Sequence, residues 1–329
     1  MSKIAVIILN YNGKNYLEQF LPSVIEHSQY AEIIVADNAS TDDSIPFLQQ
    51  HHPDLRQIVL DQNYGFAGGY NKALEQVSAD YFVLLNSDVE VTTGWLDPMV
   101  SFLEKNPDYA ACQPKILDFN RKDHFEYAGA AGGYVDVLGY PFCRGRVFDT
   151  IEKDEGQYND EADVFWATGA CFTIRSDLFT AIGGFDKDFF AHMEEIDLCW
   201  RLLNHGHKIR YIPDSKVYHV GGGTLSQSSA FKTYLNFRNS FYVLIKNIPL
   251  LQLSWKLPLR WMMDWLAVFR FVLSGEFHHA KGIIRAHGSV IKNFRKVFNK
   301  RNRTDVRHLS RFSIVFKYFV SGKKTYSTL

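Results

Sequence analysis

The stretch that most constrains the fold is ADYFVLLNSDVEV, residues 79–91. Its apolar residues 81–85 lead directly into the polar triplet Asn86-Ser87-Asp88. A continuous apolar run of this kind is typical of a central parallel strand that is covered on both faces. Ligands of open α/β sheets bind where such strands end, so Asp88 is expected at a ligand site, where a carboxylate can hold Mg²⁺ against a diphosphate. The alternative is an ordinary surface turn, because Asn, Ser and Asp are common turn residues.

Three further apolar runs precede this strand, at residues 4–9, 32–36 and 57–60, and each predicts a buried strand. Between the first two, residues 15–27 carry apolar side chains at the period of an amphipathic helix. Alternating strands and helices predict a doubly wound, mostly parallel sheet. With 329 residues, the chain has room for one large α/β domain and an additional region.

A glycine-rich segment, residues 65–69, follows the third predicted strand and precedes a helix expected to end near Val77. Its small residues would allow the backbone to approach a ligand or another strand closely. A nicotinamide-dependent enzyme is the alternative, because a glycine turn before a helix can hold a dinucleotide pyrophosphate. However, the spacing G-x-x-G-G differs from G-x-G-x-x-G, and the segment does not follow the first strand.

In the second half of the chain, residues 119–160 predict long loops or a hairpin over the sheet edge. A later helix begins with three acids, Glu194, Glu195 and Asp197, one of which could be a general base. The alternative is that these acids only stabilise the helix N-terminus. His219 follows a predicted strand and precedes three glycines, so it is either a second metal ligand or a structural residue.

The formal net charge is zero, but the charge is unevenly distributed. Residues 232–329 carry 19 Lys and Arg against three Asp and Glu, so this region carries +16 and the preceding part −16. Such asymmetry favours an anionic partner, either nucleic acid or a membrane surface. The four cysteines lack metal-type spacing and are expected to be core residues in a reducing compartment. The N-terminus lacks a signal-peptide profile.

The order of these motifs resembles the family 2 glycosyltransferases, inverting enzymes with the GT-A fold, and in particular their rhamnosyltransferase-like bacterial branch. The resemblance covers roughly residues 4–247. The segments VIILNYNG, VADNASTDDS, QNYGFAGGYNKAL and LLNSDVEV resemble the nucleotide-binding motifs, with Asn86 in place of the first aspartate of D-x-D. The donor-binding residues that the resemblance implies are Tyr11, Asp37, Asn63, Gly65, Asn71, Asn86 and Asp88.

The segment HMEEIDLCWRL resembles the catalytic motif E-D-x-D-L-x-x-R. Glu195 stands where the family has its general base, an aspartate, and its extra methylene leaves the choice open between Glu195 and Glu194. Asp197 is the third acid of this motif. VYHVGGGT resembles the family's metal segment and implies that His219 and Asp88 hold Mg²⁺ or Mn²⁺. WATGACF resembles the acceptor-side segment, which implies the residues Trp166, Gly169 and Ala170.

From residue 231 the chain becomes aromatic, basic and helical. Residues 257–275 are the only candidate for a membrane span, and Arg260, Asp264 and Arg270 make a spanning helix costly. Tryptophans beside a polar stripe instead predict helices that lie in a membrane interface. The basic residues expected to attract anionic headgroups are Lys292, Arg295, Lys296, Lys300, Arg301 and Arg303. The alternative is a bundle that packs on the catalytic domain with a solvated basic face.

The resemblance implies a GT-A catalytic domain over residues 1–230, and the change of composition predicts a helical region over residues 231–329. The resemblance implies inverting transfer of rhamnose or a similar hexose from a nucleotide-diphosphate sugar to a hydroxyl of a bacterial surface glycan or lipid-linked acceptor. The expected location is the cytoplasmic face of the inner membrane. Nucleic acid is not expected, since it would not explain the Trp and Leu content, and self-association is left open. The alternative is a non-catalytic nucleotide- or glycan-binding member of the same fold.

Overall fold

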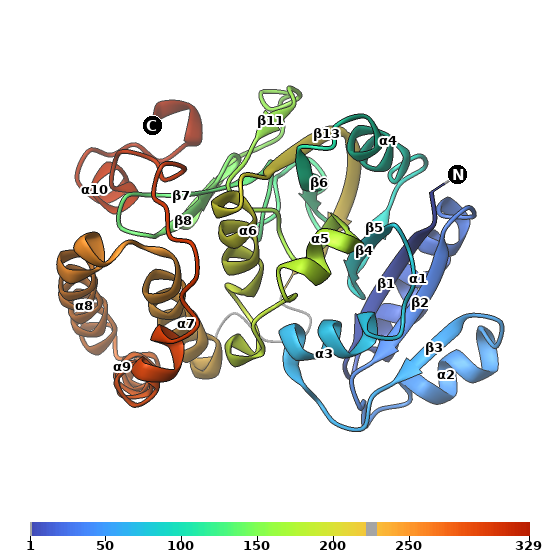
Figure 1. Ribbon diagram of the computed structural model, residues 1–329, viewed down its shortest axis with the longest axis horizontal. Helices are drawn as coiled ribbons and strands as arrows, with labels where there is room; N and C mark the ends of the chain where they lie inside the picture. Colours follow the sequence, from blue (N-terminus) through green and yellow to red (C-terminus); the bar gives the residue numbers. More distant parts are fainter. Residues whose placement is uncertain (1, 222–228) are drawn as a thin grey trace.

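The computed structural model describes residues 2–221 and 229–329, and a mixed, mostly parallel sheet of nine strands organises it (Figure 1). Four strands run parallel in the order β3, β2, β1, β4. Their bounds are β1 (Ile4–Asn10), β2 (Glu32–Asp37), β3 (Arg56–Val59) and β4 (Tyr81–Asn86). This half confirms the parallel strands predicted from the apolar runs, within one residue at most ends.

Beyond β4, the sheet continues with strands of both directions. Strand β12 runs antiparallel between β4 and β6, and β13 runs parallel to β6. Short strands β5 and β11 pair with β13. The bounds are β5 (Val89–Val91), β6 (Tyr109–Asp118), β11 (Ala162–Asp163), β12 (Cys171–Arg175) and β13 (Lys208–His219). Strand β13 is continuous, but its register against β6 shifts after Lys208 and again between Ile212 and Lys216.

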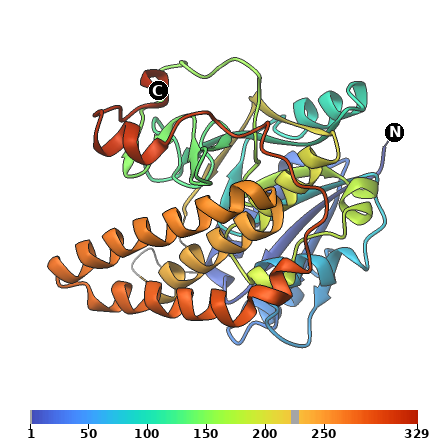
Figure 2. The ribbon, with the colours of Figure 1, turned by 60° about the vertical axis from the view of Figure 1, so that its left-hand side comes forward.

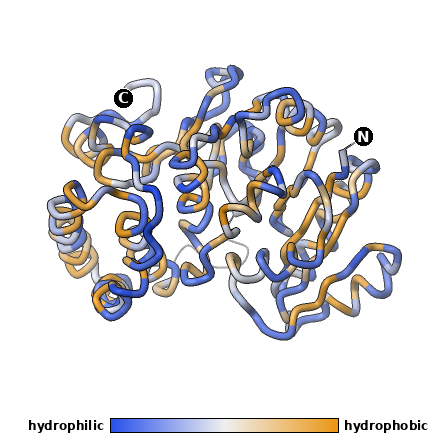
Figure 3. Tube along the Cα trace, viewed as in Figure 1, coloured by the Kyte–Doolittle hydropathy of each residue, from blue (hydrophilic) through white to orange (hydrophobic). Residues whose placement is uncertain are grey.

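Helices cover both faces of this sheet, because alternate side chains of each central strand point to opposite sides. Val6 and Ile8 pack toward α1, α2 and α4, whereas Ala5 and Ile7 pack toward α3, α5 and α6. The bounds are α1 (Lys14–His27), α2 (Ser44–His51), α3 (Gly65–Leu74), α4 (Asp97–Lys105), α5 (Ser176–Ala181) and α6 (Glu194–Asn204). The covered strands β1 and β2 appear as hydrophobic segments of the chain trace (Figure 3).

Residues 133–151 form a separate four-stranded antiparallel sheet, where long loops or a hairpin were predicted. Its strands are β7 (Gly133–Val135), β8 (Pro141–Cys143), β9 (Arg146–Val147) and β10 (Thr150–Ile151). The prediction missed this sheet because two- and three-residue strands are too short to show a periodic pattern. The end of the chain packs on it through α10 (Ile314–Phe319) and a 3₁₀ turn (Tyr326–Thr328).

The C-terminal region is helical, as predicted, with α7 (Ala230–Asn247), α8 (Leu250–Leu273) and α9 (Phe277–Phe298). Helix α7 packs on α6, and α8 and α9 form a long antiparallel hairpin beside it (Figure 2). Residues of α7 share one hydrophobic core with Trp200 of α6 and Phe189. No helix within residues 2–221 and 229–329 is long and apolar enough to cross a membrane.

Candidate active site

A cavity of about 400 Å³ opens at the carboxyl ends of β1 and β4. Its walls come from distant parts of the sequence, including the ends of the central strands, the first turns of α3 and α6, and the first turn of α7. This volume lies in the range of small-molecule and cofactor sites. The cavity therefore stands where the sequence predicted a ligand site, beyond the end of the strand that contains Leu85.

One wall of the cavity is a network of side-chain amides. Asn38 donates to Asn63 Oδ1 over 3.1 Å and to Gly65 O over 3.0 Å, and it accepts from the backbone N–H of Tyr64. Asn63 in turn accepts from the Gly65 N–H over 2.8 Å. Tyr11, Asn38 and Asn63 line the cavity. Planar amide groups and a phenol ring in this position offer hydrogen bonds and a stacking surface to a nucleotide.

The glycine-rich segment forms the first turns of α3, rather than a loop before the helix as predicted. The prediction failed because a glycine cluster normally disfavours a helix interior. Gly65 has φ +70°, and a Cβ there would lie 2.5 Å from the Phe190 carbonyl oxygen. The position therefore requires glycine, both for its left-handed backbone and for its close contact with the segment before α6.

Three of the implied binding residues do not line the cavity. Asp37 is buried behind its wall and accepts from Asn10 Nδ2 over 2.9 Å. Asn71 exchanges two hydrogen bonds with the backbone of Phe185. Trp166 donates its Nε1–H to the Tyr134 carbonyl within the core. The structure thus places these residues as supports of the site, whereas the implied acceptor-side residues Gly169 and Ala170 do line the cavity, next to Thr168.

The two implied metal ligands face each other inside the cavity. Asp88 Oδ1 lies 3.1 Å from His219 Nε2, and both side chains are buried. The backbone fixes this meeting, because His219 ends β13, which pairs with β5 directly after Asp88. Asn86 Nδ2 lies 3.5 Å from the same imidazole nitrogen. The triplet and the histidine, 131 residues apart in sequence, thus form one cluster.

Glu126, which was not predicted from the sequence, completes this cluster from the other side of the imidazole. Its Oε1 atom lies 3.4 Å from His219 Nδ1, an ion-pair distance, and its side chain is buried. Burial disfavours the charged imidazolium, but Asp88 and Glu126 outweigh that cost and hold the pKa of His219 well above its usual range. No pattern around residue 126 pointed to this role, because its neighbours are loop residues whose fold was not predicted.

Carboxylate and imidazole donors at a cavity wall fit a divalent cation that also takes phosphate and water ligands. Asp88 and His219 Nε2 would be the protein ligands. Glu126 approaches the opposite ring nitrogen, so it would orient the histidine rather than bind the same ion. Within residues 2–221 and 229–329, no three His, Cys, Asp or Glu side chains converge as a ready metal cage.

The two candidate bases stand at the first turn of α6, and both line the cavity. Glu194 Oε2 and Glu195 Oε2 are buried without a hydrogen-bond partner among the described residues. Burial raises the pKa of Glu195 to about 7 and that of Glu194 well above its usual range. A carboxyl group with a pKa near neutrality is suited to accept a proton at physiological pH.

The backbone before α6 is unusual, since Phe190, His192 and Met193 all have φ near +70°. Non-glycine residues rarely adopt this conformation, which persists only where the surrounding structure enforces it. The buried amide of Asn239 on α7 enforces it here by donating to the carbonyl oxygens of Phe189, Ala191 and His192, at 2.7 to 3.0 Å. Helix α7 therefore holds the turn that places Glu194 and Glu195 at the cavity.

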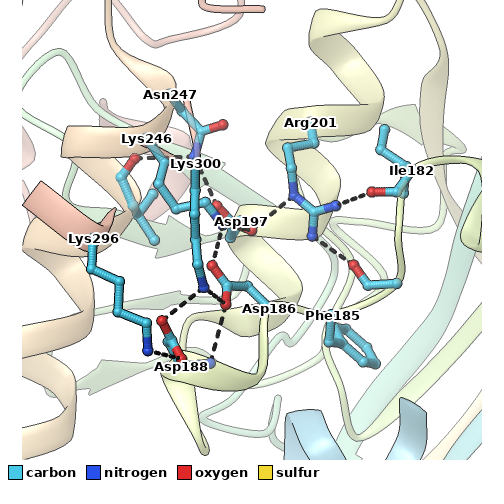
Figure 4. Close-up of polar contacts among 12 residues, drawn as sticks. Ile182, Phe185, Asp186, Asp188, Asp197, Arg201, Lys246, Asn247, Lys296 and Lys300 are labelled. Atoms are coloured by element: carbon cyan, nitrogen blue, oxygen red, sulfur yellow. Dashed lines mark hydrogen bonds and ion pairs between the residues drawn. The ribbon is translucent and has the colours of Figure 1, made fainter. Parts of the chain in front are cut away.

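Asp197, the third predicted catalytic acid, lies outside the cavity in an ion-pair network between α6 and α7 (Figure 4). It accepts from Lys246 Nζ over 2.7 Å and from Arg201 Nε over 2.9 Å. Burial would raise the pKa of this carboxyl group, but Lys246 and Arg201 hold it below its usual range. A carboxylate held this way is a poor proton acceptor, so its placement favours a positioning role over catalysis.

Two further cavity residues were not predicted, His192 and Lys232. His192 Nε2 is buried without a hydrogen-bond partner among the described residues, and burial lowers the pKa of His192 to about 4. Lys232, in the first turn of α7, has its pKa lowered by burial. No sequence pattern pointed to Lys232, because it belongs to a region that was expected to face a membrane or solvent.

The family model described as Glycosyl transferase family 2 matches residues 5–183, which is more than half of the chain. The chain belongs to glycosyl transferase family 2. It is a glycosyltransferase, and the sugar that it transfers comes from a nucleotide sugar. The family predicted from the motif order is thus confirmed.

Among its relatives, the N-acetylglucosaminyl-diphospho-decaprenol L-rhamnosyltransferase of Mycobacterium tuberculosis is 26% identical over 279 residues, covering 79% of this glycosyltransferase and 89% of the relative. The rhamnosyltransferase WbbL of Escherichia coli K12 is 26% identical over 225 residues, covering 66% and 83%. These similarities confirm the predicted relation to bacterial rhamnosyltransferases at the level of homology.

Solved structures confirm the predicted fold. TarS residues 1–349 of S. aureus, in complex with UDP-GlcNAc, superimposes with a TM-score of 0.58 at 16% identity, covering 91% of this glycosyltransferase and 84% of that chain. The mannosyltransferase PcManGT of Pyrobaculum calidifontis, in complex with GDP-Man and Mn²⁺, gives a TM-score of 0.51 at 16% identity with the same coverage. Both neighbours thus hold a nucleotide sugar, and the second also holds Mn²⁺.

Proposed function

We propose that this glycosyltransferase is an inverting, metal-dependent enzyme that moves rhamnose or a similar hexose from a nucleotide-diphosphate sugar to an acceptor hydroxyl. One observation carries the proposal: a single cavity is lined both by the Asp88–His219 pair and by Glu194 and Glu195, whose buried Oε2 atoms have no hydrogen-bond partner among the described residues. The first pair suits the diphosphate of a donor, and the second suits the proton of an acceptor.

In the proposed reaction, Glu195 accepts the proton of the acceptor hydroxyl. The acceptor oxygen then forms a bond to the anomeric carbon while the bond from that carbon to the diphosphate oxygen breaks on the opposite face. The single displacement inverts the anomeric configuration and leaves the nucleoside diphosphate with the bonding electron pair. Burial supports this role, because it raises the pKa of Glu195 to about 7.

Asp88 and His219 are proposed to hold Mg²⁺ or Mn²⁺. A bound divalent cation supplies positive charge that offsets the charge developing on the leaving diphosphate. Lys232 lines the same cavity and adds a cation of the chain itself. Tyr11, Asn38 and Asn63 are proposed to bind the nucleoside, with Asp37 acting behind them through Asn10.

The proposed acceptor is a bacterial surface glycan or a lipid-linked precursor, reached from the cytoplasmic face of an anionic membrane. The mycobacterial relative supports this choice, because it is named for an acceptor linked to diphospho-decaprenol, a lipid. The basic charge of residues 232–329 supports it for this chain. A non-catalytic member of the fold is the second candidate, because Asn86 stands where the resemblance has an acid.

Asp88→Ala tests the metal assignment. We expect the variant to lose transfer and to lose the Mn²⁺-dependent increase in melting temperature that a panel of nucleotide sugars produces with the native protein. A ligand at a hundred times its Kd stabilises the folded state by about 2.7 kcal/mol, so the loss is measurable. Asp54→Ala, at an exposed carboxylate, is the matched control. Turnover at the native rate in Asp88→Ala would contradict the metal assignment. If the native protein binds the donor but shows neither transfer nor hydrolysis, the non-catalytic candidate is favoured.

A further inference from the structure

Helix α8 buries its charged residues and exposes large apolar ones, the reverse of a typical surface helix of a globular protein. Its charged residues Lys256, Arg260 and Asp264 recur every four positions and are all buried. Its large apolar residues face outward, and Leu251 and Leu273 are 84% and 72% exposed. The outward apolar face of α8 consists of Leu251, Trp255, Met262, Leu266, Phe269 and Leu273.

Two of the three buried charges of α8, Arg260 and Asp264, have partners within the protein. Arg260 donates to the Leu138 carbonyl over 3.0 Å, and its guanidinium lies 3.6 Å from the ring centre of Tyr140. Asp264 pairs with His287 of α9 over 3.0 Å. These contacts fix the rotation of α8 about its axis, so its apolar face is directed outward by specific bonds rather than by chance.

Helix α9 also carries exposed apolar residues, with charge beside them. Phe277, Ile284 and Ile291 recur every seven residues and are exposed, and the exposed lysines Lys281 and Lys292 lie next to them on the helix. Over residues 250–298, the six exposed basic residues are Arg270, Lys281, Arg285, Lys292, Arg295 and Lys296. Glu276 is the one exposed acid of the same range.

The structure corrects which basic residues are available to a partner. Lys296 and Lys300 pair with Asp188 and Asp186, and Arg301 donates to the carbonyl oxygens of Ile245 and Ile248. These three were predicted to attract headgroups, and they instead attach the C-terminal region to the catalytic part. The polar stripe predicted beside the tryptophans faces inward.

This surface also has a defined relation to the cavity. Phe231 and Lys232, in the first turn of α7, line the cavity. The same turn packs on the first half of α9, where Thr233 Oγ1 lies 2.7 Å from His279 Nδ1 and a Cβ at Gly282 would lie 3.0 Å from the Ala230 carbonyl oxygen. The first turn of α7 therefore connects the cavity to the α8–α9 hairpin, which extends away from it as two long helices (Figure 2).

We propose that the outward face of the α8–α9 hairpin lies on an anionic lipid bilayer, with its apolar residues among the acyl chains and Lys281 and Lys292 at the headgroups. Outward tryptophans and leucines beside a row of lysines are the features of helices that lie in a membrane interface. This inference rests on the proposed function, since it specifies how a lipid-linked acceptor reaches the cavity: the bilayer contacts the helices that form the α7 side of the site.

A bilayer is favoured over a second copy of the chain by charge. In a two-fold interface the same patch occurs on both partners, so the lysines of α9 would add like charges around the contact. Anionic headgroups instead neutralise them. Apolar burial and lysine attraction also predict different salt responses, because only the attraction is screened at physiological ionic strength.

The test is flotation of the full-length protein with vesicles of phosphatidylethanolamine and phosphatidylglycerol, and with neutral phosphatidylcholine vesicles. We expect binding to the anionic vesicles that weakens with salt. The paired changes Leu266→Glu and Leu273→Glu should abolish binding, and Lys281→Glu with Lys292→Glu should weaken it by about thirtyfold or more. The matched controls are Val59→Glu, at an exposed apolar residue of β3, and Lys105→Glu with Lys208→Glu.

Two further measurements distinguish a loss of membrane binding from a loss of folding or of the active site. Quenching of Trp255 and Trp265 by brominated lipid reports insertion directly, and Mn²⁺-dependent donor binding reports an intact site. Native-like donor binding without vesicle binding would overturn this inference alone, whereas vesicle binding without any donor binding would overturn the proposed function alone. A stable dimer in which Leu266→Glu dissociates the two copies, with no vesicle binding, would assign the face to a second copy.

Discussion

At the scale of single residues, the ionisation of Glu195 is expected to set the pH dependence of transfer. Burial raises its pKa to about 7, and a general base acts only when deprotonated. The ratio kcat/KM should therefore be constant above about pH 7 and fall about tenfold per unit well below it. A pH series with Mn²⁺ and donor at fixed concentrations measures this. A profile that stays flat from about pH 5 to pH 8 would contradict the assignment of a buried carboxylate as the base.

The paired variants Glu195→Gln and Glu194→Gln decide which glutamate is the base. Glutamine keeps the shape and removes the proton acceptor, so the variant at the base should lose transfer by about 10²–10⁴-fold while donor binding is kept. We expect this result for Glu195→Gln, measured as single-turnover transfer and as donor affinity. If Glu194→Gln is inactive and Glu195→Gln is not, the base is Glu194.

Glu126 yields a prediction that the motifs alone could not provide. It lies 3.4 Å from His219 Nδ1, so it would fix the ring with Nε2 directed toward Asp88. Outer-shell carboxylates of metal-binding histidines typically contribute about 10–100-fold to metal affinity. Glu126→Gln should therefore weaken Mn²⁺ binding by that factor, as measured by the electron paramagnetic resonance of free Mn²⁺. Glu155→Gln, at an exposed glutamate, should leave the affinity unchanged.

At the scale of elements, strands could be predicted where the sequence has continuous apolar runs. β1, β2 and β4 lie in the sheet interior and consist almost entirely of such runs, so their positions were confirmed. The start of α3 was predicted wrongly, because its glycines are needed for close packing, Gly65 against Phe190, Gly68 against Tyr64 and Gly69 against Leu9, which helix propensity does not reveal. For α8, the periodicity identified a helix but could not say which face is buried, since that depends on tertiary partners such as Tyr140.

The candidate site divides in the same way. Residues at strand ends, such as Asp88 and His219, could be predicted because the topology brings the carboxyl ends of neighbouring strands together. Glu126 and Lys232 could not, because the loop and the helix that carry them reach the cavity only through tertiary packing. Asn239 was missed for the same reason, since its role depends on three carbonyl oxygens of another segment.

Asn239 connects α7 to the turn before α6, and its removal should affect catalysis through geometry. Asn239→Ala would leave buried carbonyl oxygens without a donor, at a cost of about 1–3 kcal/mol in the free energy of unfolding. We expect kcat to fall and the donor Kd to stay close to native, because the amide wall around Asn38 is untouched. Urea unfolding and steady-state kinetics measure the two effects. Asn299→Ala, at an exposed asparagine, is the control, and equal losses in donor affinity and kcat would contradict a positioning role.

At the scale of the whole molecule, one hydrophobic core connects the α/β part to the C-terminal helices. It includes Phe82 and Leu84 of β4, Trp200 of α6, and Phe241 and Leu244 of α7. The ion pairs of Lys246 and Lys300 with Asp186 and Asp197 cross the same boundary (Figure 4). The amino-acid composition therefore changes near residue 230, but one hydrophobic core extends across this position. We expect the two regions to fold as one unit.

This expectation predicts a single unfolding transition for the full-length protein. Tryptophan fluorescence is dominated by residues of both regions, such as Trp95 and Trp200 in one and Trp255 and Trp265 in the other, while circular dichroism follows all helices. If the core is shared, the two signals should give the same midpoint in urea. A nucleotide sugar with Mn²⁺ should move that midpoint as a whole, because ligand binding at the cavity stabilises every element that unfolds with it. Two transitions, with only one shifted by the donor, would contradict a shared core. They would mean that the helical region folds independently and that the cavity binds the donor without α7.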